Sequence, residues 1–255
     1  AATAGPGLPG ALVVGLNGAR GVAFARGLPF IPTDHIEGHV CANWLLPEEP
    51  PLPAIALVVS GGHTELLLME AHGRYRRLGG TRDDAAGEAF DKVARLLGLG
   101  YPGGPPVSKL AASAGPHRVR LPRAWLRGTD DFSFSGLKTA VQQLVASPDA
   151  PPHAAIADAF EESVADVLSV KAVRAAEREG VASILLAGGV AANPRLRARL
   201  RERASVPVFI PPPDLCTDNA AMIGAAAYRH LDLMVPSATA LDVRPTVSRR
   251  AFALR

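Results

Sequence analysis

Two kinds of hydrophobic pattern alternate along the 255-residue chain. The runs Ala54–Val59 and Ser183–Ala187 are almost continuously apolar, which is typical of buried strands, and residues 64–69 follow the first run closely enough to return as its partner. Elsewhere apolar residues recur three and four positions apart, and this spacing predicts helices. The longest predicted helix is His153–Glu179, which Gly180 ends. Strands that alternate with helices predict an α/β fold with ligands in a cleft between two lobes.

Shorter patterns complete the predicted element order. The proline-rich segment 47–53 is rigid and is the best candidate for a domain boundary. The further elements that we expect are a strand end at 1–3, a helix at 8–26, a short strand at 30–32, a helix at 35–46, a strand at 74–78, helices at 83–98 and 108–114, an alternating strand at 132–138 that turns into a helix, a helix from 194, a strand at 206–210, and an alanine-rich helix that residues 216–219 open and that ends near 231.

The helix expected at 35–46 opens with two histidines. His35 and His39 are four residues apart, so they lie one turn above the other on the same face, where two imidazoles can bind one metal ion. Asp34 can cap this helix, and Glu37 can reach back to complete a capping box. Asp218, far along the chain, is a candidate third ligand, and two histidines with one carboxylate suit iron or zinc. Two plainer interpretations stay open: polar histidines on a half-exposed turn, and Asp218 as a helix cap.

The histidine pair does not match a metalloprotease. Zincins carry H-E-x-x-H and their inverted relatives carry H-x-x-E-H. Here the glutamate, Glu37, is the middle residue of His35-Ile36-Glu37-Gly38-His39. Capping explains Glu37 better than general-base catalysis does.

Two glycine-rich turns follow buried strands. Residues 60–62 (Ser-Gly-Gly) come after Ala54–Val59, and residues 188–193 come after Ser183–Ala187 and lead into Pro194 at a helix start. Both arrangements can bring backbone N–H groups close to a phosphate or a carbonyl. The first is equally explained as a plain hairpin turn, and the second is neither a Walker A nor a Rossmann motif.

Basic residues gather in two segments. Four arginines surround Trp125 between residues 117 and 127, which fits either a nucleic-acid contact or a solvated loop. Five arginines alternate between residues 195 and 203, so they spread around a helix, and we expect a solvated surface there.

Composition narrows the remaining classes. The formal charge of +3 and the pI near 9.1 permit a nucleic-acid partner without demanding one. Only two cysteines, Cys41 and Cys216, are present, so a disulfide framework is excluded and a cytoplasmic location is expected. The longest apolar stretch, 8–24, is interrupted by polar residues and glycines, so we expect no membrane span. The start lacks a signal peptide and resembles a chain that begins within a fold.

Taken in order, these motifs resemble one family from end to end. They are Thr3-Ala4-Gly5-Pro6-Gly7-Leu8, His35 to His39, Val59-Ser60-Gly61-Gly62-His63-Thr64, Asp83 to Lys92, Tyr101-Pro102-Gly103-Gly104-Pro105, Phe132 to Lys138, Gly188 to Asn193, and Cys216-Thr217-Asp218-Asn219. This ordered set is similar to the bacterial TsaD family, once called glycoproteases, which comprises tRNA threonylcarbamoyltransferases of the two-lobed actin/Hsp70/sugar-kinase (ASKHA) fold. The resemblance implies that residues 1–53 are the remainder of lobe I with the metal helix, that 54–213 form lobe II, and that 214–255 return to lobe I.

The resemblance also implies a reaction and its participants. The threonylcarbamoyl group of threonylcarbamoyl-AMP would be transferred to N6 of adenosine 37 in tRNAs that read codons beginning with A. One divalent metal ion per subunit, Fe(II) first and zinc second, would be held by His35, His39 and Asp218. The implied substrate or nucleotide contacts are Val58, Val59, Ser60, Gly61, Gly62, Asp91, Gly104 and Asn193. No residue is assigned as the general base. The implied protein partners are a TsaB-like paralogue and a TsaE-like ATPase, with no membrane partner.

The chain departs from the family at its front. Members begin with a strand-rich segment that carries an Asp-Glu pair before the Gly-Pro-Gly turn, and this sequence has none of it. We therefore expect either a fragment or a first lobe that has lost much of its sheet, and an isolated chain that is inactive. Some relatives also carry an aspartate where Ser108 stands, so a ribose contact is expected to differ.

Two other classes compete with the transferase. One is a non-catalytic scaffold like the family's paralogue, which would need no metal. The other is an ATPase or kinase of the same fold, whose magnesium chemistry prefers carboxylates and water to imidazoles. The retained pair of histidines with Asp218 favours the transferase over both.

Overall fold

The structure is a computed structural model that describes residues 1–245. Its strands are β1 (Ala2–Gly5), β2 (Pro29–Phe30), β3 (Pro32–Asp34), β4 (Ala54–Val59), β5 (Thr64–Ala71), β6 (Arg74–Gly80), β7 (Ser183–Ala187), β8 (Val208–Phe209) and β9 (Val235–Pro236). Its helices are α1 (Pro9–Ala25), α2 (His35–Cys41), α3 (Ala86–Leu96), α4 (Gly104–Ala112), α5 (Ser135–Val145), α6 (His153–Glu179), α7 (Pro194–Arg203), α8 (Pro213–Cys216) and α9 (Ala220–Tyr228), with 3-10 turns η1 (Ala42–Leu45), η2 (Gly189–Ala192) and η3 (Leu231–Leu233).

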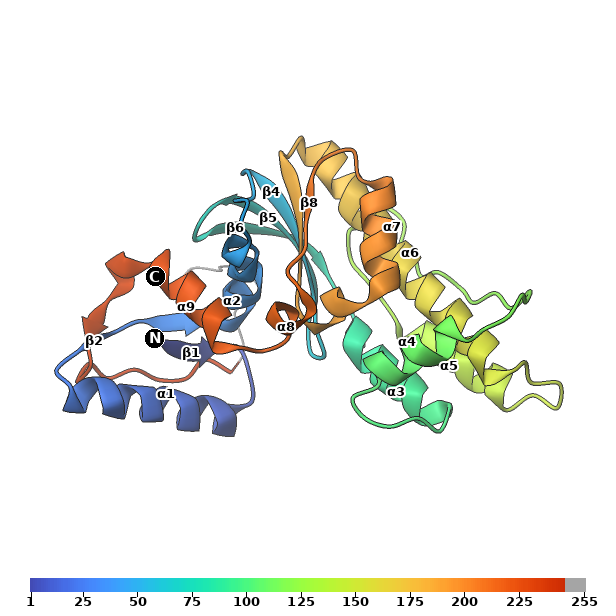
Figure 1. Ribbon diagram of the computed structural model, residues 1–255, viewed down its shortest axis with the longest axis horizontal. Helices are drawn as coiled ribbons and strands as arrows, with labels where there is room; N and C mark the ends of the chain where they lie inside the picture. Colours follow the sequence, from blue (N-terminus) through green and yellow to red (C-terminus); the bar gives the residue numbers. More distant parts are fainter. Residues whose placement is uncertain (246–255) are drawn as a thin grey trace.

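A five-stranded sheet of order β6-β5-β4-β7-β8 forms the centre of the molecule (Figure 1). β4 pairs with β5 in antiparallel and with β7 in parallel, and β8 extends the parallel part. Alternate residues of β4 face two different cores. Ile55, Leu57 and Val59 pack with the core that α3 and α6 complete. Residues 54, 56 and 58 pack instead against Ile36 and Val40 of α2. Both faces of β4 are therefore covered, which explains why every position of this strand is apolar.

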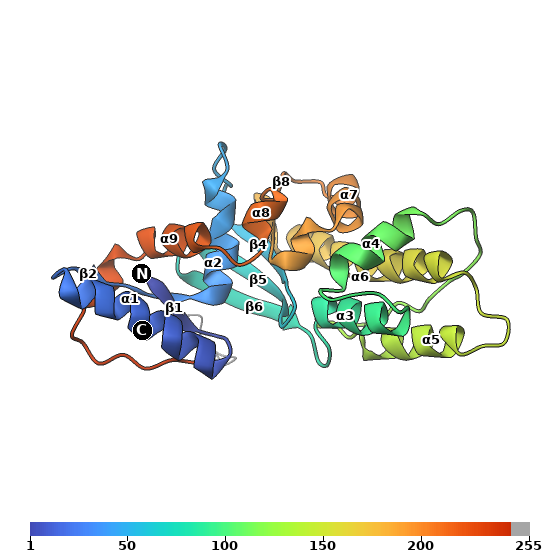
Figure 2. The same cartoon turned by 60° about the horizontal axis from the view of Figure 1, so that its bottom comes forward.

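The N-terminal and C-terminal segments lie together beside this sheet. β1 pairs with β3 in parallel, and β2 pairs with β9 in antiparallel. The helix α9 lies next to α2 and β3 on one side, whereas α3 to α7 lie on the other side (Figures 1 and 2). Residues near 220 therefore pack against the helix that begins at residue 35, although the two segments are far apart in the sequence.

Most predicted elements are present, with two differences in kind. Residues 132–138 are not a strand followed by a helix. Phe132 makes only an isolated bridge to Thr81, and α5 begins at Ser135. The alternation there arises because Phe132 and Phe134 of an extended loop both insert into the core. The helix from His35 is also shorter than predicted, since it ends at Cys41 and continues only as η1.

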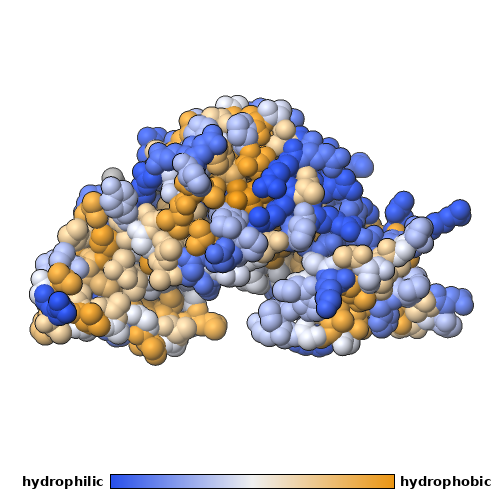
Figure 3. Space-filling model, viewed as in Figure 1, coloured by the Kyte–Doolittle hydropathy of each residue, from blue (hydrophilic) through white to orange (hydrophobic). Residues whose placement is uncertain are grey.

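Several large apolar side chains are exposed on α1 and beside it. Val14, Val22 and Phe24 of α1, and Leu8 just before it, are each exposed by more than 60% of their area. Figure 3 shows apolar side chains gathered on this part of the molecule. Among residues 1–245, no helix combines the length and hydrophobicity needed to cross a membrane.

Candidate metal centre and adjoining cleft

The first turn of α2 fixes the two histidines. Asp34 is the N-cap, and its Oδ1 accepts a hydrogen bond of 2.9 Å from the backbone N–H of Glu37. The imidazoles of His35 and His39 then lie one turn apart, with ring centroids 4.8 Å from each other. His39 is only 2% exposed, so the inner ring is held inside the protein while His35 borders the cleft.

Asp218 reaches these rings from the loop that precedes α9. Its Oδ1 lies 3.2 Å from Nε2 of His39 and 3.6 Å from Nε2 of His35. The helix cap is Asn219, whose side chain accepts from the backbone N–H of Met222. The alternative prediction that Asp218 serves as the cap is therefore wrong, and its carboxylate is left to face the histidines.

Close packing of α9 on α2 makes this approach possible. Gly38 lies between the two histidines, and a Cβ added there would be 2.8 Å from Cδ1 of Ile223 in α9. A side chain at position 38 would require the end of Ile223 to move, so the glycine favours the close packing of the two helices.

The pKa shifts of His35 and Asp218 suit the binding of a cation. Burial lowers the pKa of His35, and the neighbouring His39 lowers it further, so its imidazole is neutral at pH 7. The pKa of Asp218 is lowered chiefly by His39, so its carboxylate is ionised. Neutral imidazoles and an ionised carboxylate are the forms that bind metals.

The buried ring of His39 also lacks hydrogen bonds. Neither ring nitrogen has a partner with hydrogen-bond geometry among residues 1–245, and leaving such atoms unsatisfied is costly. One donor atom from each of His35, His39 and Asp218 lies within 4.8 Å of the others. A single metal ion would satisfy Nε2 of His39 and join the three donors, so these residues fit one.

A cleft of about 1,060 Å³ opens beside the three side chains. Its walls come from residues 1–15, from the turn between β4 and β5, and from the start of α9. In that turn the backbone N–H of Ser60 donates to the carbonyl of His63, and Ser60 Oγ accepts from the N–H of His63. Residues 60–62 therefore form a hairpin turn, as one of the two alternatives held, and they also line the cleft. Their binding of a phosphate or a carbonyl stays a prediction.

The other predicted substrate contacts occupy three different environments. Val58 and Val59 are fully buried in β4 and can offer only backbone atoms. Asp91 accepts a hydrogen bond of 2.7 Å from the N–H of Gly103, next to Gly104 at the start of α4. None of these four residues lines the cleft beside His35.

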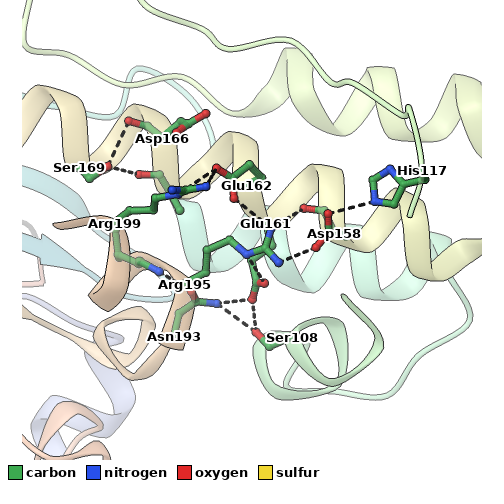
Figure 4. A network of polar contacts seen from close by, with 12 residues as sticks. Ser108, His117, Asp158, Glu161, Glu162, Asp166, Ser169, Asn193, Arg195 and Arg199 are labelled. Atoms are coloured by element: carbon green, nitrogen blue, oxygen red, sulfur yellow. Dashed lines mark hydrogen bonds and ion pairs between the residues drawn. The ribbon is translucent and has the colours of Figure 1, made fainter. Parts of the chain in front are cut away.

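Asn193 is the cap of α7 and the centre of a polar network (Figure 4). Its Nδ2 donates to Ser108 Oγ at 3.0 Å and to Glu161 Oε1 at 2.6 Å. Ser108 Oγ donates to the same carboxylate at 2.6 Å, and Nε of Arg195 lies 3.1 Å from Glu161 Oε2.

The sequence patterns did not lead us to predict a role for Glu161, which is only 4% exposed. One feature of the sequence could have indicated it. Glu161 lies four residues after Ala157 and four before Ala165, so it is a carboxylate on a helix face that is otherwise apolar.

Four of the five arginines of α7 do not form the solvated surface that the sequence predicted, whereas Arg201 is exposed. Arg195 pairs with Asp158, Arg199 with Glu162, and Arg203 with Asp166 (the first two drawn in Figure 4). Arg197 donates to the carbonyls of Ala191 and Pro211. The carboxylate partners on α6 are Asp158, Glu162 and Asp166, which are four residues apart, so one face of α6 matches the side chains of α7.

Glu37 also has a different role from the predicted one. Its side chain does not complete a capping box. Its Oε1 accepts from Tyr75 Oη at 3.0 Å and lies 2.8 Å from His230 Nε2. The carboxylate between the two candidate ligands is thus tied to β6 and to the end of α9.

This contact predicts a pH-dependent stability. The hydrogen bond that His230 donates to the Glu37 carboxylate raises the pKa of His230 above 6.5, and burial opposes this shift. The stabilisation is therefore complete below pH 6.5 and is lost as the pH rises through the raised pKa of the folded protein. We expect His230→Gln to lower the melting temperature clearly at about pH 6 and much less at about pH 9. Burial raises the pKa of Asp34 to about 7, so this group also titrates in this range. It does so in both the parent protein and the variant, so its effect cancels in the difference between their melting temperatures. A difference that stays constant with pH would contradict this prediction.

Solved structures share the fold of this chain. The crystal structure of T. kodakarensis HypF matches with a TM-score of 0.61 at 15% identity, over 82% of this chain and 38% of that one. This likeness supports the fold alone. It agrees with the predicted α/β fold of the actin/Hsp70/sugar-kinase class.

Curated relatives are much closer in sequence. The tRNA N6-adenosine threonylcarbamoyltransferase of Dehalococcoides mccartyi is 50% identical over 248 residues, which are 97% of this chain and 76% of that protein. The one of Thermomicrobium roseum is 50% identical over 98% of this chain and 77% of its own length. Residues 1–225 match the family model described as TsaD, tRNA N6-adenosine threonylcarbamoyltransferase. The chain therefore belongs to the TsaD family of tRNA N6-adenosine threonylcarbamoyltransferases, as its ordered motifs indicated.

Proposed function

We propose that the chain transfers the threonylcarbamoyl group of threonylcarbamoyl-AMP to N6 of adenosine 37 in tRNAs that read codons beginning with A. The N6 amine attacks the carbamoyl carbon and a C–N bond forms. The bond between that carbon and the phosphate oxygen breaks, AMP leaves, and one N6 proton is released to solvent. The observation that carries the proposal is the meeting of His35, His39 and Asp218 at the edge of the cleft that the turn 60–62 lines.

The chain's own residues would bind and orient the reactants. His35, His39 and Asp218 would hold one divalent ion, Fe(II) in our proposal with zinc as the alternative. When bound, this ion would supply Lewis-acid chemistry to the threonylcarbamoyl group. The backbone of residues 58–62 would hold the adenylate phosphate. Asp91, Gly104 and Asn193 would contact its nucleoside. The hydrogen-bonded turn at Ser60 keeps this backbone in place before substrate binds.

The scaffold and the kinase alternatives are both less consistent with this site. A scaffold has no need of a buried histidine like His39, whose ring nitrogens make no contact of hydrogen-bond geometry among residues 1–245. A magnesium-dependent kinase would gain little from two imidazoles. The exposed apolar face of α1 suits a protein partner, and we propose that a TsaB-like paralogue covers it, with a TsaE-like ATPase completing a cytoplasmic assembly.

The direct test is mass spectrometry of nucleosides from tRNA incubated with the chain, its partners, Fe(II) and threonylcarbamoyl-AMP. We expect modified adenosine in a transcript that reads a codon beginning with A, and none when adenosine 37 is replaced by guanosine. Modification that persists in the guanosine transcript would refute adenosine 37 as the modified nucleoside. If the complex with Fe(II) and threonylcarbamoyl-AMP produces no modified adenosine, the proposed reaction is refuted.

Glu161 provides a test of the nucleoside site. Its carboxylate orients Asn193 and Ser108, so Glu161→Ala should free both side chains. A hydrogen bond to a charged group contributes about 1.5–3 kcal/mol, so we expect KM for threonylcarbamoyl-AMP to rise about tenfold or more. The rate at saturating adenylate should change much less.

The control for this prediction is Glu162→Ala, the next residue of α6. Glu162 pairs with Arg195 and Arg199 but does not touch Asn193. The Glu162→Ala variant should alter stability without altering KM for threonylcarbamoyl-AMP. Equal effects of the two variants on KM would contradict the assignment of Asn193 to the nucleoside site.

A further inference from the structure

The basic segment around Trp125 is held rigidly against α6. Residues 113–134 contain no helix and no strand beyond one isolated bridge. His117 nevertheless lies 3.0 Å from Asp158, and Arg123 pairs with Asp166 at 2.7 Å. The buried Lys171 donates to the carbonyls of Thr129 and Asp131 at 2.8 and 2.6 Å. The backbone is thus fixed, and the side chains that are not used as anchors project from a defined surface.

A groove of about 600 Å³ lies between this segment, β6 and the last turns of α6. We call it the basic groove. Six of its lining side chains are cationic, namely Arg76, Arg77, Arg127, Lys171, Arg174 and Arg178. Only two, Asp130 and Glu179, are carboxylates.

The two carboxylates are already engaged. Arg178 lies 2.6 Å from Asp130, and both Arg76 and Arg178 contact Glu179. Within residues 1–245, neither Arg127 nor Arg174 lies at ion-pairing distance from a carboxylate, and both are exposed. The groove therefore keeps an uncompensated positive charge, which attracts a polyanion.

Trp125 adds an aromatic surface to this charge. Its indole is half-buried, packs against the main core and also lines the groove. Arginine guanidinium groups bind phosphate in a bidentate manner, and an exposed aromatic face stacks on an unpaired base. The combination matches RNA better than it matches an acidic protein, which offers no base to stack.

We infer that the basic groove is a docking surface for tRNA, with its arginines on backbone phosphates and Trp125 against an unpaired base. The inference rests on the proposed function for the identity of the RNA. The groove shares no lining residue with the cleft at His35, so it would hold a part of the tRNA away from the reacting adenosine.

The test measures the affinity of the full chain for an unmodified tRNA transcript by fluorescence anisotropy at several salt concentrations. The variant is Arg127→Glu with Arg174→Glu. We expect affinity to fall about tenfold near 0.1 M salt, and the slope of log K against log salt to decrease by about one for each lost phosphate contact. The matched control is Arg26→Glu with Arg201→Glu, which reverses the same charge at exposed positions outside the groove. An affinity loss no greater than that of the control would overturn the inference.

Trp125 is tested separately. Trp125→Leu should weaken binding about fivefold or more, whereas Trp125→Phe should retain most of the affinity because it keeps a stacking face. Unfolding curves that match the parent protein show that a lost affinity is not lost folding. An unchanged affinity of Trp125→Leu would overturn the stacking contact.

These measurements are independent of the transfer reaction. They use no adenylate, so a complex that binds tRNA through the groove but modifies nothing would refute only the proposed function. A modifying complex whose groove variants bind tRNA normally would refute only the docking surface.

Discussion

His39→Ala should abolish both metal retention and tRNA modification. The side chain is buried, its ring nitrogens have no hydrogen-bond partner in the described part of the chain, and Nε2 faces Asp218 at 3.2 Å. Residues that merely support metal ligands contribute about 10–100-fold to affinity or activity, so a lost ligand should cost at least about hundredfold. Metal content of the purified protein and modified adenosine per tRNA are the two measurements. His35→Ala should act in the same direction and leave nucleotide binding partly intact.

His63→Ala is the matched control for the metal content. His63 lines the same cleft but lies outside the group of three candidate ligands. It should retain metal at the level of the parent protein. A His39→Ala protein that holds as much metal as His63→Ala and still modifies tRNA would refute the metal centre.

Gly188→Ala should strongly destabilise the fold. Gly188 follows β7 with φ of +88° and ψ of 166°, and a Cβ there would be 2.4 Å from the carbonyl oxygen of Val59 at the end of β4. Backbone strain of this kind costs about 1–3 kcal/mol, and the clash with fixed backbone adds to it. Because about 1 kcal/mol shifts the melting temperature by about 2–4 °C in a chain of this size, we expect a fall of about 5–10 °C.

Gly189→Ala is the control for this second prediction. The neighbouring glycine has nothing within 4 Å of its added Cβ. Its substitution should change the free energy of unfolding by about 0.5 kcal/mol or less. Thermal unfolding followed by circular dichroism compares the two proteins. Similar melting temperatures would show that the two strand ends can separate to admit a side chain.

Local patterns in the sequence predicted most strands and helices because the spacing of apolar residues within one segment indicates which of the two it forms. β4, β7 and α6 have the predicted bounds, since continuous burial and helical spacing are visible within each segment. The ordered motifs also led to the correct family, which residues 1–225 match. The division into 1–53, 54–213 and 214–255 and the individual substrate contacts remain predictions.

Predictions from local sequence patterns were wrong where a side chain contacts residues that are distant in the sequence. The alternation at Phe132 and Phe134 looks like a strand but arises from two anchors of an extended loop. Glu37 has the spacing of a capping box, yet Tyr75 and His230 bind it. In each case the competing interaction comes from a residue that is remote in sequence.

The sequence by itself determined the order of strands and helices, the histidine pair on one face of α2, and the family. These properties depend on backbone periodicity and on the identity of nearby residues. Only the tertiary structure decided that Asn219 rather than Asp218 caps α9, that Glu161 binds Asn193, and that Trp125 and Arg127 line one groove with arginines of β6 and α6. Those outcomes depend on packing between segments far apart in the chain, where neither spacing nor composition specifies which atoms meet.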